Sequence, residues 1–267
     1  MEKSTIYENL RFKRFSILFG LAVSVGLFAQ NDKQTKDIQS KTNTKALTTL
    51  AEKLKKNQIP EKELMLKAQK QNTPYKGEFE NKLYQLQSFK KKKNIPMYYT
   101  THNIGAANGT NTSKLNSIFN LEGSGIKIRE WDGGAVKTTH TEFGGRVVQK
   151  DTPASFSDHS THVAGTLVAS GVNPNAKGMA PKATLDAYDW TNDEIEMATA
   201  ATAGALVSNH SYGYLGGFEW GDWSGNVGWH WFGGDGDTEY IEYGQYSQAD
   251  ADWDNIANNA GFYLPVK

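Results

Sequence analysis

Residues 158–166 read Asp-His-Ser-Thr-His-Val-Ala-Gly-Thr, and this stretch decides how the fold of the chain is interpreted. His159 stands at the start of an apolar run that is compatible with a helix. A histidine held at a helix start can point its ring into a cleft and act as a general base. The valine, alanine and glycine that follow would let this helix pack closely under a sheet. Taken alone, a His-x-x-His spacing most often reflects two unrelated histidines.

The stretch resembles the histidine motif of the subtilisin-like serine peptidases, His-Gly-Thr-His-Val-Ala-Gly-Thr, except that Ser160 replaces glycine. The resemblance implies an α/β, subtilisin-like three-layer fold with a mainly parallel sheet. It also implies a serine endopeptidase that hydrolyses peptide bonds in protein or peptide substrates with an Asp-His-Ser triad. His159, not His162, would be the general base, because the first histidine of the motif faces the aspartate.

A second block supplies an aspartate at the end of an expected strand. Residues 125–131 alternate in a way that favours a strand, and Asp132-Gly133-Gly134 follows it. Functional groups in α/β sheets lie at the carboxyl ends of strands. The block resembles the aspartate motif of the same family, with Gly133 in place of serine or threonine. Although such an aspartate is most often a turn residue, its position before His159 predicts that Asp132 is the catalytic aspartate.

A third block predicts where a peptide would bind. Residues 177–185 resemble the family's Gly-Val-Ala-Pro segment, and residues 205–211 favour a strand that leads to Tyr212 and Gly213. In the family the corresponding strand runs beside the bound peptide, and an extended peptide adds to a strand edge through main-chain hydrogen bonds. We therefore expect Ser211, Tyr212 and Gly213 to bind substrate, although this tripeptide alone would suggest only a strand end and a turn.

The nucleophile of the triad is absent from the chain. In the subtilisin arrangement the serine follows the aspartate and the histidine, and the family places it in Gly-Thr-Ser-x-Ala. No such motif follows Ser211, and the family's Ala-Ala-Gly-Asn turn with the oxyanion asparagine is also missing. Residues 109–113 look similar but precede Asp132. We therefore expect a C-terminally incomplete catalytic domain that is inactive alone.

The chain divides into regions of different composition. Residues 1–29 contain a basic segment and an apolar run too short for an ordinary membrane span, which predicts a signal peptide, with an uncleaved anchor as the alternative. Residues 30–97 are rich in lysine and glutamine and predict a propeptide or a charged, partly helical spacer. Residues 98–267 form the partial peptidase domain, with an aromatic and glycine-rich insertion at 214–246.

Composition narrows the classes of function and the compartment. The formal net charge is +0, so no bulk attraction to nucleic acid or to a membrane surface is expected. The absence of cysteine excludes disulfides, thiolate catalysis and cysteine-rich zinc sites. An exported chain without cysteines predicts a secreted, periplasmic or extracellular bacterial-type protein without a stable membrane span after signal cleavage.

Two other classes of function remain open. The aromatic insertion suits a non-catalytic secreted module that binds a peptide or a glycan. A metal hydrolase could use His159, His162 and nearby carboxylates, although no His-Glu-x-x-His helix is present. No cofactor is expected. A structural Ca²⁺ at the carboxylates of the insertion is a weaker hypothesis, since the full calcium-loop pattern is missing.

Overall fold

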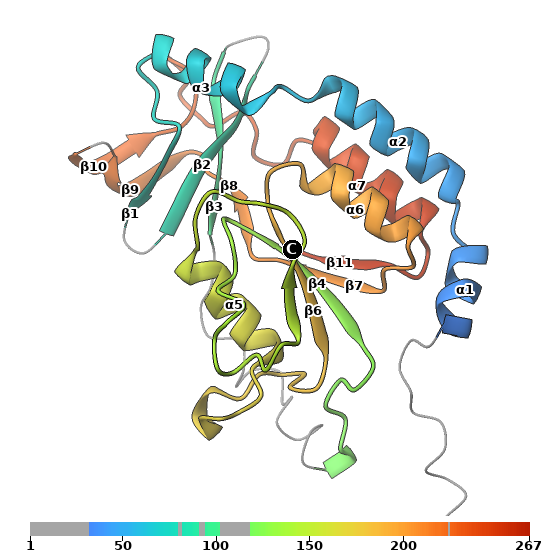
Figure 1. Ribbon diagram of the computed structural model, residues 1–267. Coiled ribbons are helices and arrows are strands. Elements are labelled where there is room, and N and C mark those ends of the chain that lie inside the picture. Colours follow the sequence, from blue (N-terminus) through green and yellow to red (C-terminus); the bar gives the residue numbers. More distant parts are fainter. Residues whose placement is uncertain (1–31, 80–81, 91–93, 102–117, 224) are drawn as a thin grey trace, which may run out of the picture.

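The computed structural model describes residues 32–79, 82–90, 94–101, 118–223 and 225–267. Its centre is a five-stranded parallel sheet with the strand order β11-β7-β4-β6-β5. The strands are β4 (Lys127–Asp132), β5 (Val147–Gln149), β6 (Thr184–Asp189), β7 (Val207–His210) and β11 (Leu264–Val266). Helix α5 (Asp158–Val168) lies on one side, and α6 (Asp193–Thr202) and α7 (Gln248–Asn259) lie on the other (Figure 1). The expected α/β fold with a parallel sheet is confirmed.

The central strand β4 is buried on both faces, as parallel strands between two helical layers are. Ile128 on one face packs in a cluster with Ala164 and Val168 of α5. Trp131 on the opposite face packs in a second cluster with residues of α6 and α7, including Met197 and Ile256. The strand therefore ends at Asp132 between two packed layers.

The N-terminal region is folded against the layer of α6 and α7. It contains α1 (Asp32–Ser40), α2 (Thr44–Asn57) and α3 (Glu61–Lys70). Asn43 caps α2 by accepting the backbone N–H of Ala46 at 3.1 Å. Leu47 of α2 is fully buried in the same cluster as Trp131. The partly helical character expected for this region therefore corresponds to a helix whose apolar face packs on α6 and α7.

A second, four-stranded sheet joins the N-terminal region to the middle of the chain. Its order is β1-β2-β3-β8, made of β1 (Lys76–Phe79), β2 (Lys82–Phe89), β3 (Pro96–Thr101) and β8 (Tyr212–Tyr214). All its pairs are antiparallel, and β3 faces β8 with Tyr99 opposite Tyr214, Thr100 opposite Gly213 and Thr101 opposite Tyr212. The strand expected to bind substrate is thus paired with β3, at the start of the peptidase region, and through β3 it is joined to β1 and β2 of the N-terminal region.

The aromatic insertion contains an antiparallel hairpin of β9 (Phe218–Trp223) and β10 (Asn226–Trp231). Trp223 stacks on Tyr84 of β2 with ring centroids 4.1 Å apart, which attaches the hairpin to the second sheet. Trp220 and Trp229 face each other across the two strands, and both side chains are exposed. One face of the hairpin therefore packs on the protein, while the other presents aromatic rings to solvent.

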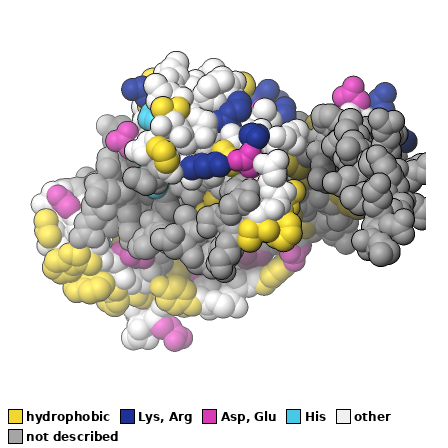
Figure 2. All heavy atoms as spheres, turned by 90° about the horizontal axis from the view of Figure 1, so that it is seen from below, with side chains coloured by type: hydrophobic (Ala, Val, Ile, Leu, Met, Phe, Trp, Pro, Cys, Tyr) yellow, Lys and Arg dark blue, Asp and Glu magenta, His cyan; other side chains and the backbone are white. Residues whose placement is uncertain are grey.

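With a formal net charge of +0, the chain is expected to have no surface dominated by one charge. On the face seen in Figure 2, Lys and Arg side chains lie in the upper part, hydrophobic side chains lie mainly along the lower edge, and neither charge covers the face. Helix α7 begins with a capping box between Ser247 and Asp250. Within the described ranges, no helix combines the length and the apolar character that crossing a membrane requires. The predicted signal peptide at 1–29 lies outside the described residues.

Candidate active site

Asp132 is the last residue of β4 and its side chain is fully buried. β4 lies between β6 and β7, so its carboxyl end stands in the middle of the row formed by the carboxyl ends of the parallel strands. One carboxylate oxygen, Oδ1, accepts the backbone N–H of Gly133 at 2.7 Å. This backbone hydrogen bond helps to orient the carboxylate.

His159 lies in the first turn of α5, whose N-terminus is capped by Ser157. Its Nδ1 is 2.9 Å from Oδ1 and 3.0 Å from Oδ2 of Asp132. A carboxylate only accepts hydrogen bonds, so the neutral ring carries its proton on Nδ1 and leaves Nε2 as a base. Nε2 is buried and has no hydrogen-bond partner among the residues that the structure describes. The structure thus brings together the two residues predicted to be catalytic.

Ser160 also contacts Asp132, and the sequence analysis assigned it no role. Its fully buried hydroxyl lies 3.1 Å from Oδ1 of Asp132 and within 3.2 Å of the carbonyl oxygens of Gly133 and Gly134. A hydroxyl has one proton to donate, so these acceptors share it. The sequence did carry a signal for this role, because Ser160 stands where the family motif has glycine.

The loop after β4 determines how Asp132 and His159 meet. Gly134 has φ +96°, and a Cβ there would come within 3.1 Å of the Ser157 Cβ and 3.2 Å of the Ser155 carbonyl oxygen. Its backbone N–H donates to Asp189 Oδ2 at 2.7 Å. Burial raises the pKa of Asp189, whereas its bonds from Thr191 and Gly134 oppose this change. Glycine at 134 therefore allows the loop to approach the start of α5.

The predicted substrate residues begin beside this site. Trp131 is paired with His210 in the sheet, so Ser211 follows β7 next to the end of β4. The Ser211 hydroxyl oxygen accepts a hydrogen bond from Asn209 Nδ2 at 2.8 Å.

Tyr212 and Gly213 lie in β8, opposite Thr101 and Thr100 of β3. The buried Tyr212 side chain donates its hydroxyl proton to Asp193 at 2.6 Å. One edge of β8 is thus paired with the chain itself, and among the described strands the other edge has no neighbour.

The residues considered for metal binding do not gather at one point. His162 is exposed on α5, whereas His159 is held by Asp132. In the insertion, Asp237 accepts the backbone N–H of Gly234 at 3.2 Å. Across the described ranges, no group of three or more histidine, aspartate or glutamate side chains is arranged to hold a metal ion.

Comparison with known proteins agrees with this geometry. No curated protein matched the chain. The model of the subtilase family, peptidase S8, matches residues 96–264. That span contains Asp132, His159 and the strand at Tyr212. Because the match covers more than half of the 267 residues, the chain belongs to the subtilase family and has a subtilisin-like serine peptidase domain.

Proposed function

We propose that this chain carries the aspartate and the histidine of a serine endopeptidase. The supporting observation is the distance of 2.9 Å between His159 Nδ1 and Asp132 Oδ1, with Nε2 left as an acceptor. In this mechanism His159 takes the proton of a serine hydroxyl as the serine attacks the peptide carbonyl. Asp132 holds the tautomer of the ring and stabilises the imidazolium that forms.

The chain of 267 residues does not hydrolyse peptides alone in this proposal. Its sequence has no Gly-Thr-Ser-x-Ala motif after Ser211 and no oxyanion asparagine in an Ala-Ala-Gly-Asn turn. One oxyanion donor contributes about 2.7–4 kcal/mol to transition-state stabilisation. Without the nucleophile, the base at His159 has no hydroxyl to activate, and peptide binding without cleavage remains.

The N-terminal region acts as a propeptide in the same proposal. Support comes from Leu47, which is buried against the peptidase layer, and from β1 and β2, which extend the sheet formed by β3 and β8. Export follows from the basic and apolar character of residues 1–29. Secretion is measured by whether a culture that expresses the gene releases the protein without these residues.

The experiment for the peptidase proposal compares two proteins. The 267-residue protein is expected to give no turnover of casein. A version extended by the rest of a subtilase catalytic domain, including the Ala-Ala-Gly-Asn turn and the Gly-Thr-Ser-x-Ala motif, is expected to hydrolyse casein and to react with a fluorophosphonate. His159→Ala in the extended version should abolish turnover, whereas His162→Ala, at an exposed position, should not. Fluorophosphonate-sensitive turnover by the 267-residue protein would contradict the proposal.

A binding module is the second function, and one observation favours it. Trp220 and Trp229 form an exposed aromatic pair on the free face of the β9–β10 hairpin. Such rings can stack on the faces of sugars or on apolar peptide side chains. Trp229→Ala should lower the affinity for a glycan or peptide ligand of this module without changing the pairing of Asp132 and His159. Unchanged binding in that variant would remove the aromatic pair from this role.

A further inference from the structure

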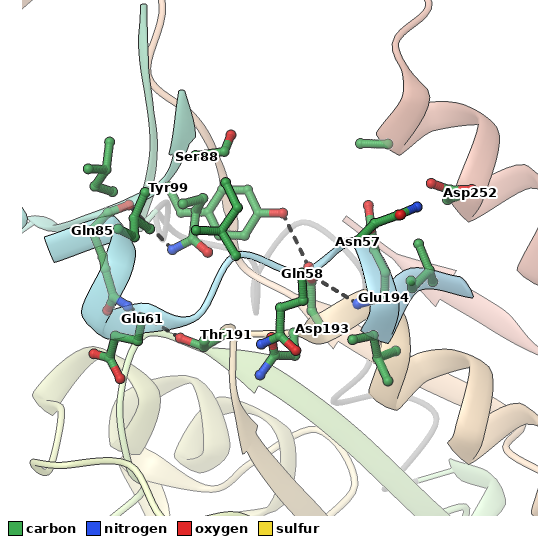
Figure 3. A pocket seen from close by; sticks show the side chains of 18 of the residues that line it. Asn57, Gln58, Glu61, Gln85, Ser88, Tyr99, Thr191, Asp193, Glu194 and Asp252 are labelled. Carbon is green, nitrogen blue, oxygen red and sulfur yellow. Dashed lines mark hydrogen bonds between the residues drawn. The ribbon is translucent and has the colours of Figure 1, made fainter. Parts of the chain in front are cut away.

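A cavity of about 390 Å³ lies between the N-terminal region and the peptidase layer. Its size falls in the range of small-ligand pockets. The N-terminal wall is built from the end of α2, the start of α3 and β2, and includes Gln58, Glu61 and Gln85. The opposite wall comes from the starts of α6 and α7 and from single residues of β3 and β8 (Figure 3).

All the charged side chains that line the cavity are negative. Four carboxylates face the cavity, and no lysine or arginine is among its lining residues; the carboxylates are those of Glu61, Asp193, Glu194 and Asp252. In Figure 3, Glu194 and Asp252 lie at the same end of the cavity, on facing helices. Asp193 is already bonded to the hydroxyls of Tyr212 and Tyr99. Asp252 accepts one hydrogen bond, from Gln248 Nε2 to Oδ1 at 3.1 Å, and the Glu194 carboxylate accepts none from a described residue.

A positive group already lies near two of these carboxylates, since the charge of the Lys267 ammonium opposes the rise in the pKa of Asp193 and of Glu194. The Lys267 ammonium lies 4.5 Å from the ring centre of Trp253 and 4.9 Å from that of Tyr212. The rings of Tyr99 and Tyr214 follow at 5.3 and 5.9 Å. Cations over aromatic faces at such distances are attracted by the ring quadrupoles. Tyr99 and Tyr214 also line the cavity, so the same two rings can face an ammonium group from the cavity side.

We propose that this cavity binds an alkylammonium group, with Glu194 and Asp252 as counter-charges and Tyr99 and Tyr214 as aromatic walls. A lysine side chain of a peptide and a small primary amine share this chemistry. A divalent metal ion is not assigned to it, since no three histidine, aspartate or glutamate side chains of the described residues are grouped to hold a metal ion. The inference concerns binding alone and does not depend on peptide hydrolysis.

The protonation of Glu194 provides an independent readout. Burial, helped by the nearby carboxylates of Asp193 and Asp252, raises the pKa of Glu194 to about 8. Asp250 acts in the same direction, and the Lys267 ammonium opposes them. A bound cation favours the ionised carboxyl, so binding releases a proton. The affinity should therefore rise as the pH increases from 6.5 to 8.5, while an alkylammonium ligand stays charged.

The test is calorimetric titration of the full 267-residue protein with Nα-acetyl-lysine N-methylamide. The neutral analogue, Nα-acetyl-norleucine N-methylamide, has the same apolar stem and no charge. The lysine compound is expected to bind at least tenfold more tightly. The peptide acetyl-Ala-Ala-Lys-Ala-Ala-amide and 1,5-diaminopentane distinguish a peptide side chain from a free amine as the preferred source of the ammonium.

Variants complete the test. Glu194→Gln should weaken lysine binding at least fivefold and remove its pH dependence. Glu239→Gln is the matched control, because Glu239 is exposed and does not line the cavity. Circular dichroism checks folding, and Asp252→Asn replaces Glu194→Gln if the first variant does not fold. Equal binding of the lysine and norleucine compounds, no binding of either, or an equal loss in the Glu239→Gln control would overturn the proposal.

Discussion

The Ser160 hydroxyl lies 3.1 Å from Oδ1 of Asp132, the same oxygen that accepts the Gly133 N–H and faces His159. Three donors therefore converge on one carboxylate that is fully buried. Buried carboxylates require such donors, because an unpaired charge in the interior is costly. Ser160 occupies the position where the family motif has glycine and takes part in holding the aspartate.

Ser160→Ala is expected to lower the free energy of unfolding by about 1–3 kcal/mol, because a hydrogen bond to a charged acceptor is lost in a buried site. Urea denaturation followed by circular dichroism measures the change. Ser155→Ala, at an exposed position in the preceding loop, is the control and should change stability by less than about 0.5 kcal/mol. Equal stability of Ser160→Ala and the parent protein would show that the hydroxyl contributes nothing.

Asp132→Asn should change the tautomer of His159. Gly133 N–H and the Ser160 hydroxyl both donate to Oδ1, so this atom stays an oxygen and the amide nitrogen replaces Oδ2. That nitrogen would then donate to Nδ1, which lies 3.0 Å from Oδ2. The ring proton must move to Nε2, and the base is lost.

Nitrogen NMR of labelled histidine distinguishes the two tautomers of His159. The parent protein should show the proton on Nδ1 and the variant should show it on Nε2. His162 is exposed and provides the internal reference, since its signals should not change. A parent protein with the proton on Nε2 would contradict the arrangement described above.

Leu47→Ala tests whether the N-terminal region is an integral part of the fold. Leu47 is fully buried against α6 and α7. Truncation of a buried leucine usually costs about 2–5 kcal/mol. Leu66→Ala on the exposed side of α3 is the matched control and should have little effect. Comparable small effects for both variants would mean that α2 does not dock as described.

Glu196→Gln should alter the dependence of stability on pH. Burial raises the pKa of Glu196 to about 8, although its bond from Trp131 Nε1–H at 2.9 Å opposes the rise. The unfolded chain releases this proton near pH 4.3, so between about pH 4.3 and 8 the folded state binds more protons. Stability therefore falls as the pH rises through this window, by less than about 1.4 kcal/mol per unit because the carboxyl is partly exposed.

The glutamine variant retains an oxygen for Trp131 and removes the titration. Relative to the parent protein, it should become progressively more stable between pH 5 and pH 9. Urea denaturation at a series of pH values measures this difference. Glu52→Gln on the exposed side of α2 serves as the control and should leave the pH profile unchanged. A constant difference between Glu196→Gln and the parent across this range would exclude Glu196 as the titrating group.

Local sequence patterns were sufficient to locate Asp132 and His159, because each lies in a short segment whose own residues specify its structure. The run at Asp132-Gly133-Gly134 marks the end of a buried strand, and residues 157–168 carry a cap and an apolar face that specify a helix. Their order agrees with the family motifs, so the fold class and the Asp132–His159 pair could be anticipated. Composition likewise separated the N-terminal region from the peptidase region.

Contacts between segments that are far apart in the sequence could not be predicted from local patterns. The pairing of β3 with β8, the docking of Leu47 and the acidic cavity all join residues far apart in the chain. The role of Ser160 belongs to the same group, because its acceptors on the β4 loop lie beyond the reach of helical spacing.

The sequence by itself determined the parallel α/β class, the strand that ends at Asp132 and the helix that begins beside His159, because these follow from short-range periodicity and motif spacing. Only the tertiary structure decided that β8 is paired with β3 and that four carboxylates face one cavity. The physical reason is that strand partners and cavity walls are selected by long-range packing, and no local pattern along the chain encodes which distant segment supplies them.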